Sequence, residues 1–467
     1  MKKKSLLKIL GITILVVIIL TWIIPSSSFD GYSVHQQRIT PTGIWDIFNA
    51  LGMSIAYFWQ VGLFILFIGG FYGVLHKTGS LKNLVDLLTK IFKEKGLMFL
   101  IITITLFAVF TSLTGIYFPF LIFVPFFMAV ILSLGYSKLV ALLCTVGSII
   151  VGNISIMYND LVYNVLQIEG NINLWYKLGL LLGTIAVLIL FVWKTTKTKK
   201  SEQKEKVSDI LPFMVEEKKS KKGKEKLWPL ITAYSVLFVV FVLGMTKWVR
   251  AFDVNVFSRM HDWVMDVKIG NFYIFQNILG SSILPFGYWE ITELFTVIIF
   301  ALLFVGFFYK LSIKDMYESF LEGAKKVLPT AVMVTFINIV VILTLNSGFY
   351  TTVMNFFVGL TKNFNVITMS LNSFLGSILV IDNLYVSNYV INITANLLPA
   401  ESSVELLSLI NQTMYGMAML VAPTSLVLIA GLSYLEVCYL DWLKYIWRLA
   451  LILLGVVSIV LGIAYFI

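Results

Sequence analysis

The sequence predicts a polytopic, all-α membrane protein. Of its 467 residues, 59% are hydrophobic and 13% are charged, and the mean hydropathy is +0.91. Soluble domains carry roughly 25% charged residues, so we expect no sizeable soluble domain. Because a helix needs about 20 apolar residues to cross the hydrocarbon core, the chain holds about nine candidate spans. Two further apolar stretches, residues 107–124 and 375–392, have polar residues at their centres and predict re-entrant hairpins.

Charge placement orders the first half of the chain, residues 1–193. Lysines at residues 2–4 precede the first span, residues 9–24, and predict a cytoplasmic N-terminus under the positive-inside rule. We expect this span to stay uncleaved, because no small-residue cleavage site follows it. The rest of this half is, in order, a span at 51–75, a lysine-rich connector at 77–95, a hairpin at 97–134 that enters from the cytoplasm, and spans at 139–166 and 174–193.

A lysine-rich linker at residues 194–227 separates this half from the second, residues 228–467. Residues 194–226 hold twelve lysines and six acidic residues, which predicts a cytoplasmic, solvated linker. The linker therefore supplies most of the net charge of +10, and this charge does not indicate nucleic-acid binding.

The second half repeats the order of the first. Its predicted elements are spans at 228–248, 291–309 and 327–345, a hairpin at 366–398, and spans at 407–434 and 449–467. The connector before this hairpin, residues 346–365, holds one lysine, whereas residues 76–96 hold five. We therefore expect this hairpin to enter from the outside and the C-terminus to lie outside. The same order in opposite orientation is an inverted repeat, on which alternating access is commonly built.

The candidate substrate site lies where polar residues interrupt the hairpins and spans. Unwound backbone at membrane depth survives only where protein or a water-filled cavity satisfies it. Helix ends there present free N–H groups that suit a substrate carboxylate. The first-half candidates are Thr111, Ser112 and Thr114 at the hairpin tip, with Gly152, Asn153, Ser155 and Asn159 in the broken third span. The second-half candidates are Asn383, Ser387 and Asn388 at the tip, with Asn411, Gln412, Thr413, Thr424 and Ser425 in the span opposite. For any single member, ordinary helix packing is the alternative.

Asp382 is the sharpest single prediction. A carboxylate within a hydrophobic run is costly and by default indicates function, either proton or sodium binding or pairing with a substrate amine. The alternative is a hairpin tip wetted from outside. For Asp160 we expect a solvated span end, and for Glu290 and Glu293 an interfacial position.

Other features predict packing rather than chemistry. Two small-xxx-small pairs, Gly69 with Gly73 and Gly179 with Gly183, predict close helix packing. The histidines all lie in connectors, so the sequence assembles neither a metal site nor an acid–base dyad. We expect no cofactor beyond a coupling Na⁺ or H⁺.

Several motifs resemble one known family. They are Ile24-Pro25-Ser26-Ser27-Ser28-Phe29-Asp30, the run from Phe67 to Gly79, Leu134-Gly135-Tyr136, Phe320-Leu321-Glu322-Gly323-Ala324 and Ala422-Pro423-Thr424-Ser425. In this order they resemble the YfcC-like branch of the four-carbon dicarboxylate anaerobic carrier (DcuC-type) family. The resemblance implies the ion transporter superfamily fold, with two inverted repeats, two re-entrant hairpins and usually a homodimer. Its members carry carboxylates or amino acids, and some exchange arginine for ornithine.

The chain departs from the family at the first hairpin tip. A Gly-Met-Ala-Glu-Glu-Thr-like tip is usual there, whereas this chain has Gly115-Ile116-Tyr117-Phe118-Pro119-Phe120 and no carboxylate. This loss weakens the expectation of a cationic substrate.

The functional hypothesis is a secondary active transporter of a small carboxylate or amino acid. We expect it in the plasma membrane, working by an elevator-like alternating-access movement, as the resemblance suggests. An antiporter of basic amino acids, of the arginine/ornithine type, is the alternative within this class. A transport-inactive membrane scaffold is the alternative of another class. The absence of Ser/His, Cys/His and metal constellations argues against an enzyme.

Overall fold

The computed structural model describes residues 2–198, 226–360, 364–398 and 403–466. Within them, nine helices are long and apolar enough to cross a membrane, which confirms the predicted polytopic all-α fold. The strands of the described residues are short. They form two antiparallel pairs, β1 (Ser27–Phe29) with β2 (Val34–Gln36) and β3 (Lys268–Ile269) with β4 (Phe272–Tyr273). Residues 199–225 of the predicted linker lie outside the described residues.

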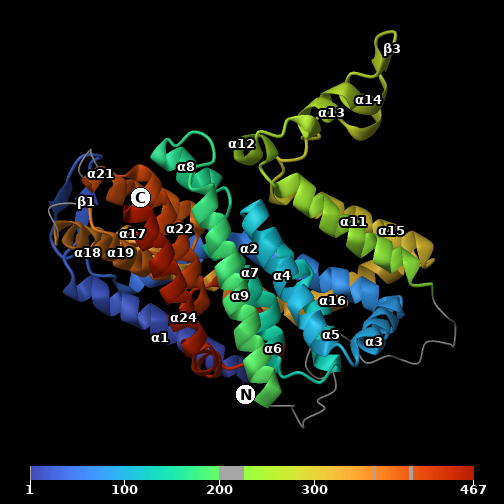
Figure 1. The fold of residues 1–467 in the computed structure, drawn as a ribbon, viewed down its shortest axis with the longest axis horizontal. Helices are drawn as coiled ribbons and strands as arrows, with labels where there is room; N and C mark the ends of the chain where they lie inside the picture. The colour runs from blue at the N-terminus through green and yellow to red at the C-terminus, as the bar shows by residue number, and fades with distance from the viewer. Residues whose placement is uncertain (1, 199–225, 361–363, 399–402, 467) are drawn as a thin grey trace.

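The first half contains two long helices, a connector, a hairpin and a broken span (Figure 1). The long helices and connector are α1 (Lys2–Ile23), α2 (Ile44–Lys77) and α3 (Ser80–Phe92). The hairpin comprises α4 (Gly96–Thr114), η1 (Pro119–Ile122) and α5 (Val124–Ser133). The broken span comprises α6 (Lys138–Leu142), the π-turn η2 (Leu143–Gly147), α7 (Ser148–Ile154) and α8 (Asp160–Leu166), before α9 (Leu174–Thr198).

The second half begins with α11 (Trp228–Met245) and α15 (Ile291–Phe308), joined by an excursion that projects from the body (Figure 1). The excursion holds α12 (Trp248–Phe252), α13 (Val256–Met265), β3, β4 and α14 (Ile274–Leu279). The next helices are α16 (Ile313–Phe336), α17 (Ile339–Ser347) and α18 (Phe349–Gly359). The hairpin follows as α19 (Val366–Leu379), α20 (Asn383–Tyr385), the π-turn η3 (Val386–Ile391) and α21 (Asn392–Leu397). The broken span is α22 (Val404–Val421) with α23 (Leu426–Leu435), before α24 (Tyr439–Phe466).

Several predicted spans begin later than the helices that form them. The helices at the spans predicted at 51–75 and 449–467 begin at Ile44 and Tyr439, and the largest difference is in the span predicted at 327–345. The sequence predicts a separate span at residues 327–345, but α16 already begins at Ile313, where Ser312 accepts a hydrogen bond from the backbone of Asp315. The apolar stretch is then divided after Phe336, and Asn338 leads into α17. The amphipathic start of α16 therefore continues the span instead of preceding it as a connector.

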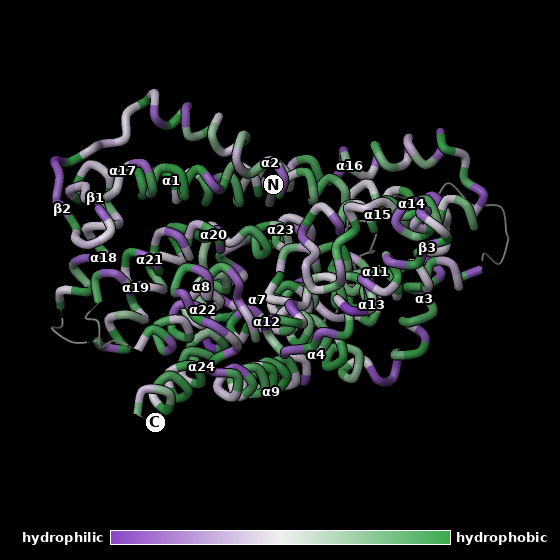
Figure 2. Tube along the Cα trace, turned by 90° about the horizontal axis from the view of Figure 1, so that it is seen from above, coloured by the Kyte–Doolittle hydropathy of each residue, from purple (hydrophilic) through white to green (hydrophobic). Residues whose placement is uncertain are grey.

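Corresponding helices pack alike in the two halves. The first hairpin helix, α4, packs on α7 and α9, and its counterpart α19 packs on α22 and α24. Figure 2 shows hydrophobic residues along nearly all of α1, α9 and α24, whereas hydrophilic residues gather at β2 and around α13. These apolar lengths are typical of helices that face lipid.

Helices α2 and α16 join the halves along a glycine seam. A Cβ placed at Gly73 would lie 2.2 Å from the carbonyl oxygen of Ser319, and one at Gly323 would lie 2.1 Å from that of Gly69. The two backbones are therefore in direct contact, and the packing predicted for Gly69 and Gly73 is confirmed. The prediction for Gly179 is wrong, since a Cβ there would meet nothing within 4 Å.

Candidate functional site

The helical chain is interrupted at four places near the middle of the molecule. The first hairpin turns after Thr114, where Gly115 adopts a left-handed backbone with φ of 70°. The third span is broken at residues 155–159, the second hairpin at 380–382 and the eighth span at 422–425. Each interruption leaves backbone N–H and C=O groups without helical partners, so the protein or a ligand must satisfy them.

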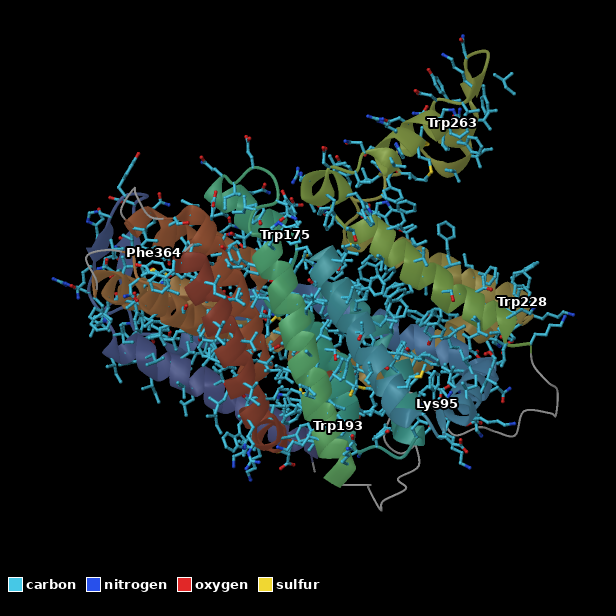
Figure 3. The ribbon with its side chains drawn as sticks, viewed as in Figure 1. Lys95, Trp175, Trp193, Trp228, Trp263 and Phe364 are labelled. Atoms are coloured by element: carbon cyan, nitrogen blue, oxygen red, sulfur yellow. The ribbon has the colours of Figure 1, made fainter. Side chains whose placement is uncertain are left out.

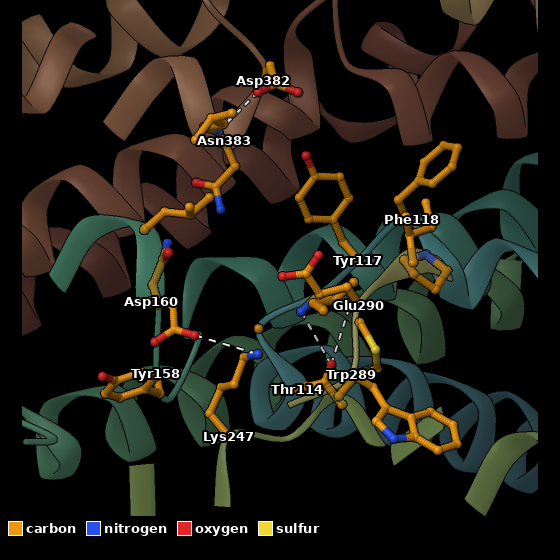
Figure 4. A pocket seen from close by; sticks show the side chains of 18 of the residues that line it. Thr114, Tyr117, Phe118, Tyr158, Asp160, Lys247, Trp289, Glu290, Asp382 and Asn383 are labelled. Carbon is orange, nitrogen blue, oxygen red and sulfur yellow. Dashed lines mark hydrogen bonds and ion pairs between the residues drawn. The ribbon is translucent and has the colours of Figure 1, made fainter. Parts of the chain in front are cut away.

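The two hairpin tips come together on one cavity of about 470 Å³ (Figure 4). The first tip contributes residues 114–119, the second residues 382–384, and the broken third span residues 158–161. Val61, Leu426 and the ends of α11 and α15 complete the wall. The residues from these ends are Met245, Lys247, Trp289, Glu290 and Ile291. The structure thus unites segments that are more than 200 residues apart.

Four of the predicted site residues line this cavity: Thr114, Asn159, Asp382 and Asn383. The others do not. They are Thr111, Ser112, Gly152, Asn153, Ser155, Ser387, Asn388, Asn411, Gln412, Thr413, Thr424 and Ser425. Most of these side chains are buried behind the cavity wall, whereas Asn388 is exposed.

Several buried members hold the broken third span in place. The Ser112 hydroxyl donates to the carbonyl oxygen of Ser155 at 2.5 Å, and the backbone N–H of Met157 donates to that of Ser112 at 2.8 Å. The Gln412 amide reaches across from α22 and donates to the carbonyl oxygen of Ile156 at 2.5 Å. These contacts satisfy freed backbone groups, so the residues shape the cavity wall without entering the cavity.

Two tyrosines connect the hairpin tips. The Tyr415 hydroxyl donates to the carbonyl oxygen of Ile381 at 2.6 Å and lies 2.9 Å from the hydroxyl of Tyr117 on the first tip. Nearby, the Thr424 hydroxyl donates to the carbonyl oxygen of Ile378 at 2.6 Å. The second tip is therefore fixed to the eighth span and, through this pair, to the first tip.

Other predicted residues serve local packing. The Ser387 and Thr413 hydroxyls donate to carbonyls one turn earlier in their own helices. A Cβ at Gly152 would lie 2.3 Å from the carbonyl oxygen of Ala108, so this glycine lets α7 approach α4. Ser373 of α19 donates to the side-chain oxygen of Asn411 at 2.5 Å.

Three of the predicted site residues have a buried side-chain oxygen without a hydrogen-bond partner among the described residues. These residues are Thr111, Asn153 and Ser425, one in α4 and one beside each broken span. A buried acceptor without a partner costs about 1–3 kcal/mol, so these positions are where a bound ion or water would be most favourable.

Charged side chains surround the cavity unevenly. Asp382 caps α20 by accepting from the backbone N–H groups of Leu384 and Tyr385, at 3.0 and 3.3 Å. Glu290 caps α15 together with Glu293. Neither Asp382 nor Glu290 has an ion-pair partner in the part of the chain that the structure describes. Glu290, predicted to be interfacial, also lines the cavity.

Asp160 bridges the broken span to the end of α11. Its carboxylate lies 2.6 Å from the Arg250 guanidinium and 3.6 Å from the Lys247 ammonium (Figure 4 shows the lysine). This hydrogen bond raises the pKa of Arg250, which keeps the arginine cationic. Asp160 is 22% exposed and doubly paired, so the prediction of a merely solvated span end is wrong.

Sequence comparison identifies the family. A sequence profile of the C4-dicarboxylate anaerobic carrier family matches residues 4–466. The chain belongs to this family. Comparison with curated protein sequences finds no match. Among solved structures, the carrier is similar to the Alcanivorax borkumensis YdaH transporter, at 12% identity and a TM-score of 0.41, over 99% of this chain and 98% of that one. Membership of this family, together with the apolar helices of the described residues, makes the protein a multi-pass membrane transporter, and the family predicted from its sequence motifs is confirmed.

Proposed function

We propose that this carrier is a secondary active transporter that binds a small carboxylate or amino acid between its two hairpin tips. One observation carries the proposal: tips from opposite halves line the same cavity of about 470 Å³. This volume is within the roughly 300–1,000 Å³ typical of small-molecule sites. A ligand there would contact the hairpin tips of both halves, so its binding could be linked to the movement of these tips against the α2–α16 pair.

The charges of the cavity favour a substrate that carries an amine. Its lining holds three carboxylates, those of Asp160, Glu290 and Asp382, and the single ammonium of Lys247. A substrate carboxylate would compete with Asp160 for Lys247, and a substrate ammonium would neutralise Asp382 or Glu290. A dicarboxylate would instead need bound protons or cations to offset this acidic excess. We therefore place amino acids ahead of dicarboxylates.

A basic amino acid exchanger is the second candidate. The first hairpin tip lacks the carboxylates usual in the family, yet Glu290 and Asp382 restore two acidic groups to the same cavity from other elements. A cationic side chain would find partners there. The candidate therefore rests on the lining of the cavity and no longer on the tip sequence.

Asp382 is the proposed coupling residue for H⁺ or Na⁺, because it lies at the moving tip and has no cationic partner among the described residues. Asp382→Asn keeps the side chain's size and one acceptor oxygen for the cap of α20. We expect it to abolish coupled uptake at normal expression. Asn388→Ala, on the exposed side of the same hairpin, is the matched control and should transport normally. Unchanged uptake by Asp382→Asn would remove this residue from the coupling site.

The proposed movement is elevator-like. The hairpins and broken spans would move with α9 and α24, while the α2–α16 seam and α11 would stay fixed. The ion pairs of Asp160 would then hold the moving broken span to the end of the fixed helix α11 in the described state. A homodimer of such fixed parts is proposed from the family resemblance alone.

The proposed orientation places the N-terminus in the cytoplasm and the C-terminus outside. In Figure 3, Lys95 and Trp193 lie toward one edge of the molecule, and Trp175 and Trp263 lie toward the opposite edge. This separation supports the sides assigned from lysine placement. The cavity and the excursion then belong to the outer side, where a second cavity of about 310 Å³ shares Asp160, Lys247 and Glu290 with the first.

The test is ligand-dependent thermal stability of the purified carrier. The panel comprises amino acids and mono- and dicarboxylates, each with and without Na⁺ and at two pH values. A ligand at 100 times its Kd stabilises the folded state by about 2.7 kcal/mol, so substrates will stand out. Stabilising compounds are then tested for uptake into proteoliposomes. Folded protein that no compound stabilises would contradict the proposal and favour the scaffold alternative.

A further inference from the structure

Lys177 is a buried lysine that the proposed transport cycle does not use. It lies in the first turn of α9 and is only 1% exposed. Its ammonium donates to the carbonyl oxygen of Met157 at 2.9 Å, to the Tyr163 hydroxyl, and more weakly to the side-chain oxygen of Asn171 at 3.4 Å. The Tyr163 ring also lies beneath it, 4.8 Å from the ammonium to the ring centroid.

The ammonium has oxygen ligands but no carboxylate partner among the described residues. Burying a charge without a counter-ion costs several kcal/mol, and a lysine near a span end can usually extend toward water instead. Here the side chain turns inward. Two of the ammonium's partners, a backbone carbonyl and the carbonyl oxygen of an asparagine side chain, are also ligand types that bind small hard cations.

The carbonyl that Lys177 binds belongs to the broken third span. Met157 lies within the break between α7 and α8, directly before the residues that line the cavity, Tyr158 to Leu161. Tyr163, the second partner, lies in α8 beyond the break. The ammonium therefore joins the broken segment to the helix α8 that follows it and fixes the position of the cavity wall.

In the second half, neutral side chains satisfy the backbone carbonyls at the broken span. There, the Trp442 indole donates to the carbonyl oxygen of Leu420 at 3.0 Å, and the Tyr439 hydroxyl donates to that of Val421. Both donors lie at the start of α24, the counterpart of α9, and both carbonyls immediately precede the break in the eighth span. Neutral donors are thus sufficient to satisfy such carbonyls, so the charge of Lys177 requires its own explanation.

We propose that the Lys177 ammonium is a tethered cation that occupies a cation-binding site at the break of the third span. As part of the chain it stays at the site, whereas a soluble ion would occupy the site only when bound. Resting on the proposed transport function, this assignment leaves cation coupling to the second half, at Asp382. Removing the ammonium should expose a site for a small soluble cation.

The test is chemical rescue of the full-length Lys177→Ala variant, purified in detergent. The probe is propylammonium chloride, which replaces the deleted atoms, and 1-propanol is its uncharged counterpart. We expect Lys177→Ala to lower Tm, and propylammonium to restore Tm progressively with concentration while propanol does not. Lys325→Ala, at an exposed position in α16, is the control and should respond to neither.

A second variant keeps the inference falsifiable if Lys177→Ala does not fold. Lys177→Met preserves length and apolar volume but removes the charge, and Lys177→Arg preserves the charge. We expect the Met variant to lose Tm and the Arg variant to retain more of it. A Met variant as stable as the wild type, or equal rescue by propanol and propylammonium, would overturn the proposal. These readouts need no substrate, so they stand apart from any failure of the transporter proposal.

Discussion

Asp160→Asn tests whether the bridge between the broken span and α11 holds the described conformation. The substitution removes the negative charge facing Arg250 at 2.6 Å and Lys247 at 3.6 Å but retains a similar shape. Because α8 belongs to the proposed moving part and Lys247 follows the proposed fixed helix α11, these ion pairs would be lost when the parts separate. Their loss should therefore depopulate the described state.

The magnitude follows from distance and exposure. A hydrogen bond to a charged group contributes about 1.5–3 kcal/mol, whereas exposed ion pairs contribute about 0–1 kcal/mol. Asp160 and Lys247 are 22% and 21% exposed, but Arg250 is 52% exposed, which moves the value toward the lower range. We take about 1 kcal/mol for the bridge, which corresponds to about a fivefold change in the conformational equilibrium.

The assay is the labelling rate of a cysteine placed at Asn383 in a cysteine-free background, using a membrane-impermeant thiol reagent from outside. Asn383 lines the cavity, which the proposed orientation places on the outer side, so labelling would report the outward-exposed state. We expect Asp160→Asn to slow labelling by up to about fivefold. Asp253→Asn, in the excursion that also holds Arg250, is the control and should leave the labelling rate unchanged.

A double-mutant cycle with Arg250→Gln identifies the interaction. If Asp160 acts through Arg250, the double variant should label no more slowly than Asp160→Asn alone, because the effects of interacting residues are not additive. Equal labelling rates for wild type and Asp160→Asn would refute the bridge. Fully additive effects of the two substitutions would assign them to separate causes.

Two further predictions concern the fixed seam and the broken span. Gly73→Ala would place a methyl group 2.2 Å from the carbonyl oxygen of Ser319, and overpacking of this kind costs about 1–3 kcal/mol. At Gly455, in contrast, an added Cβ would meet nothing within 4 Å. Gly455→Ala should therefore be neutral or stabilise the protein by up to about 1 kcal/mol. Identical melting curves for the two variants would contradict close seam packing. Gln412→Leu leaves the carbonyl oxygen of Ile156 without its partner, at a cost of about 1–3 kcal/mol, and should lower both Tm and uptake. Wild-type stability and uptake in that variant would show that the amide does not hold the break.

The sequence predicts the architecture well because the bilayer restricts the choices. Apolar length is sufficient to predict most of the spans and both hairpins. The break in the eighth span contains Pro423, which cannot donate a helical hydrogen bond. No residue of the sequence predicts that the helix is divided between α16 and α17 at Asn338. A helix can bend or end at an asparagine, but the same residue also occurs within intact helices.

The cavity was harder to predict, because its wall depends on distant segments meeting in space. Tyr117, Lys247 and Glu290 lie on three elements, and each has an ordinary explanation when its own neighbours are considered alone. Lys247 and Glu290 follow or precede spans, where charged residues are common. The sequence does not single out Lys177 either, because a lysine near a span end is ordinary and its partners lie 14 and 20 residues away. Conversely, the sequence predicts Gln412 as a substrate-binding residue, but its side chain lies behind the wall and donates to the backbone carbonyl of Ile156.

The glycine seam has a consequence for how the chain could be divided. Each half provides one helix of the α2–α16 pair and one hairpin tip of the cavity, so neither half contains the complete cavity wall or a complete support for it. The covalent connection between the halves is thus secondary to their interlocking surfaces. Two polypeptides separated within residues 199–225 would still need each other to fold, and together they contain every described wall of the cavity.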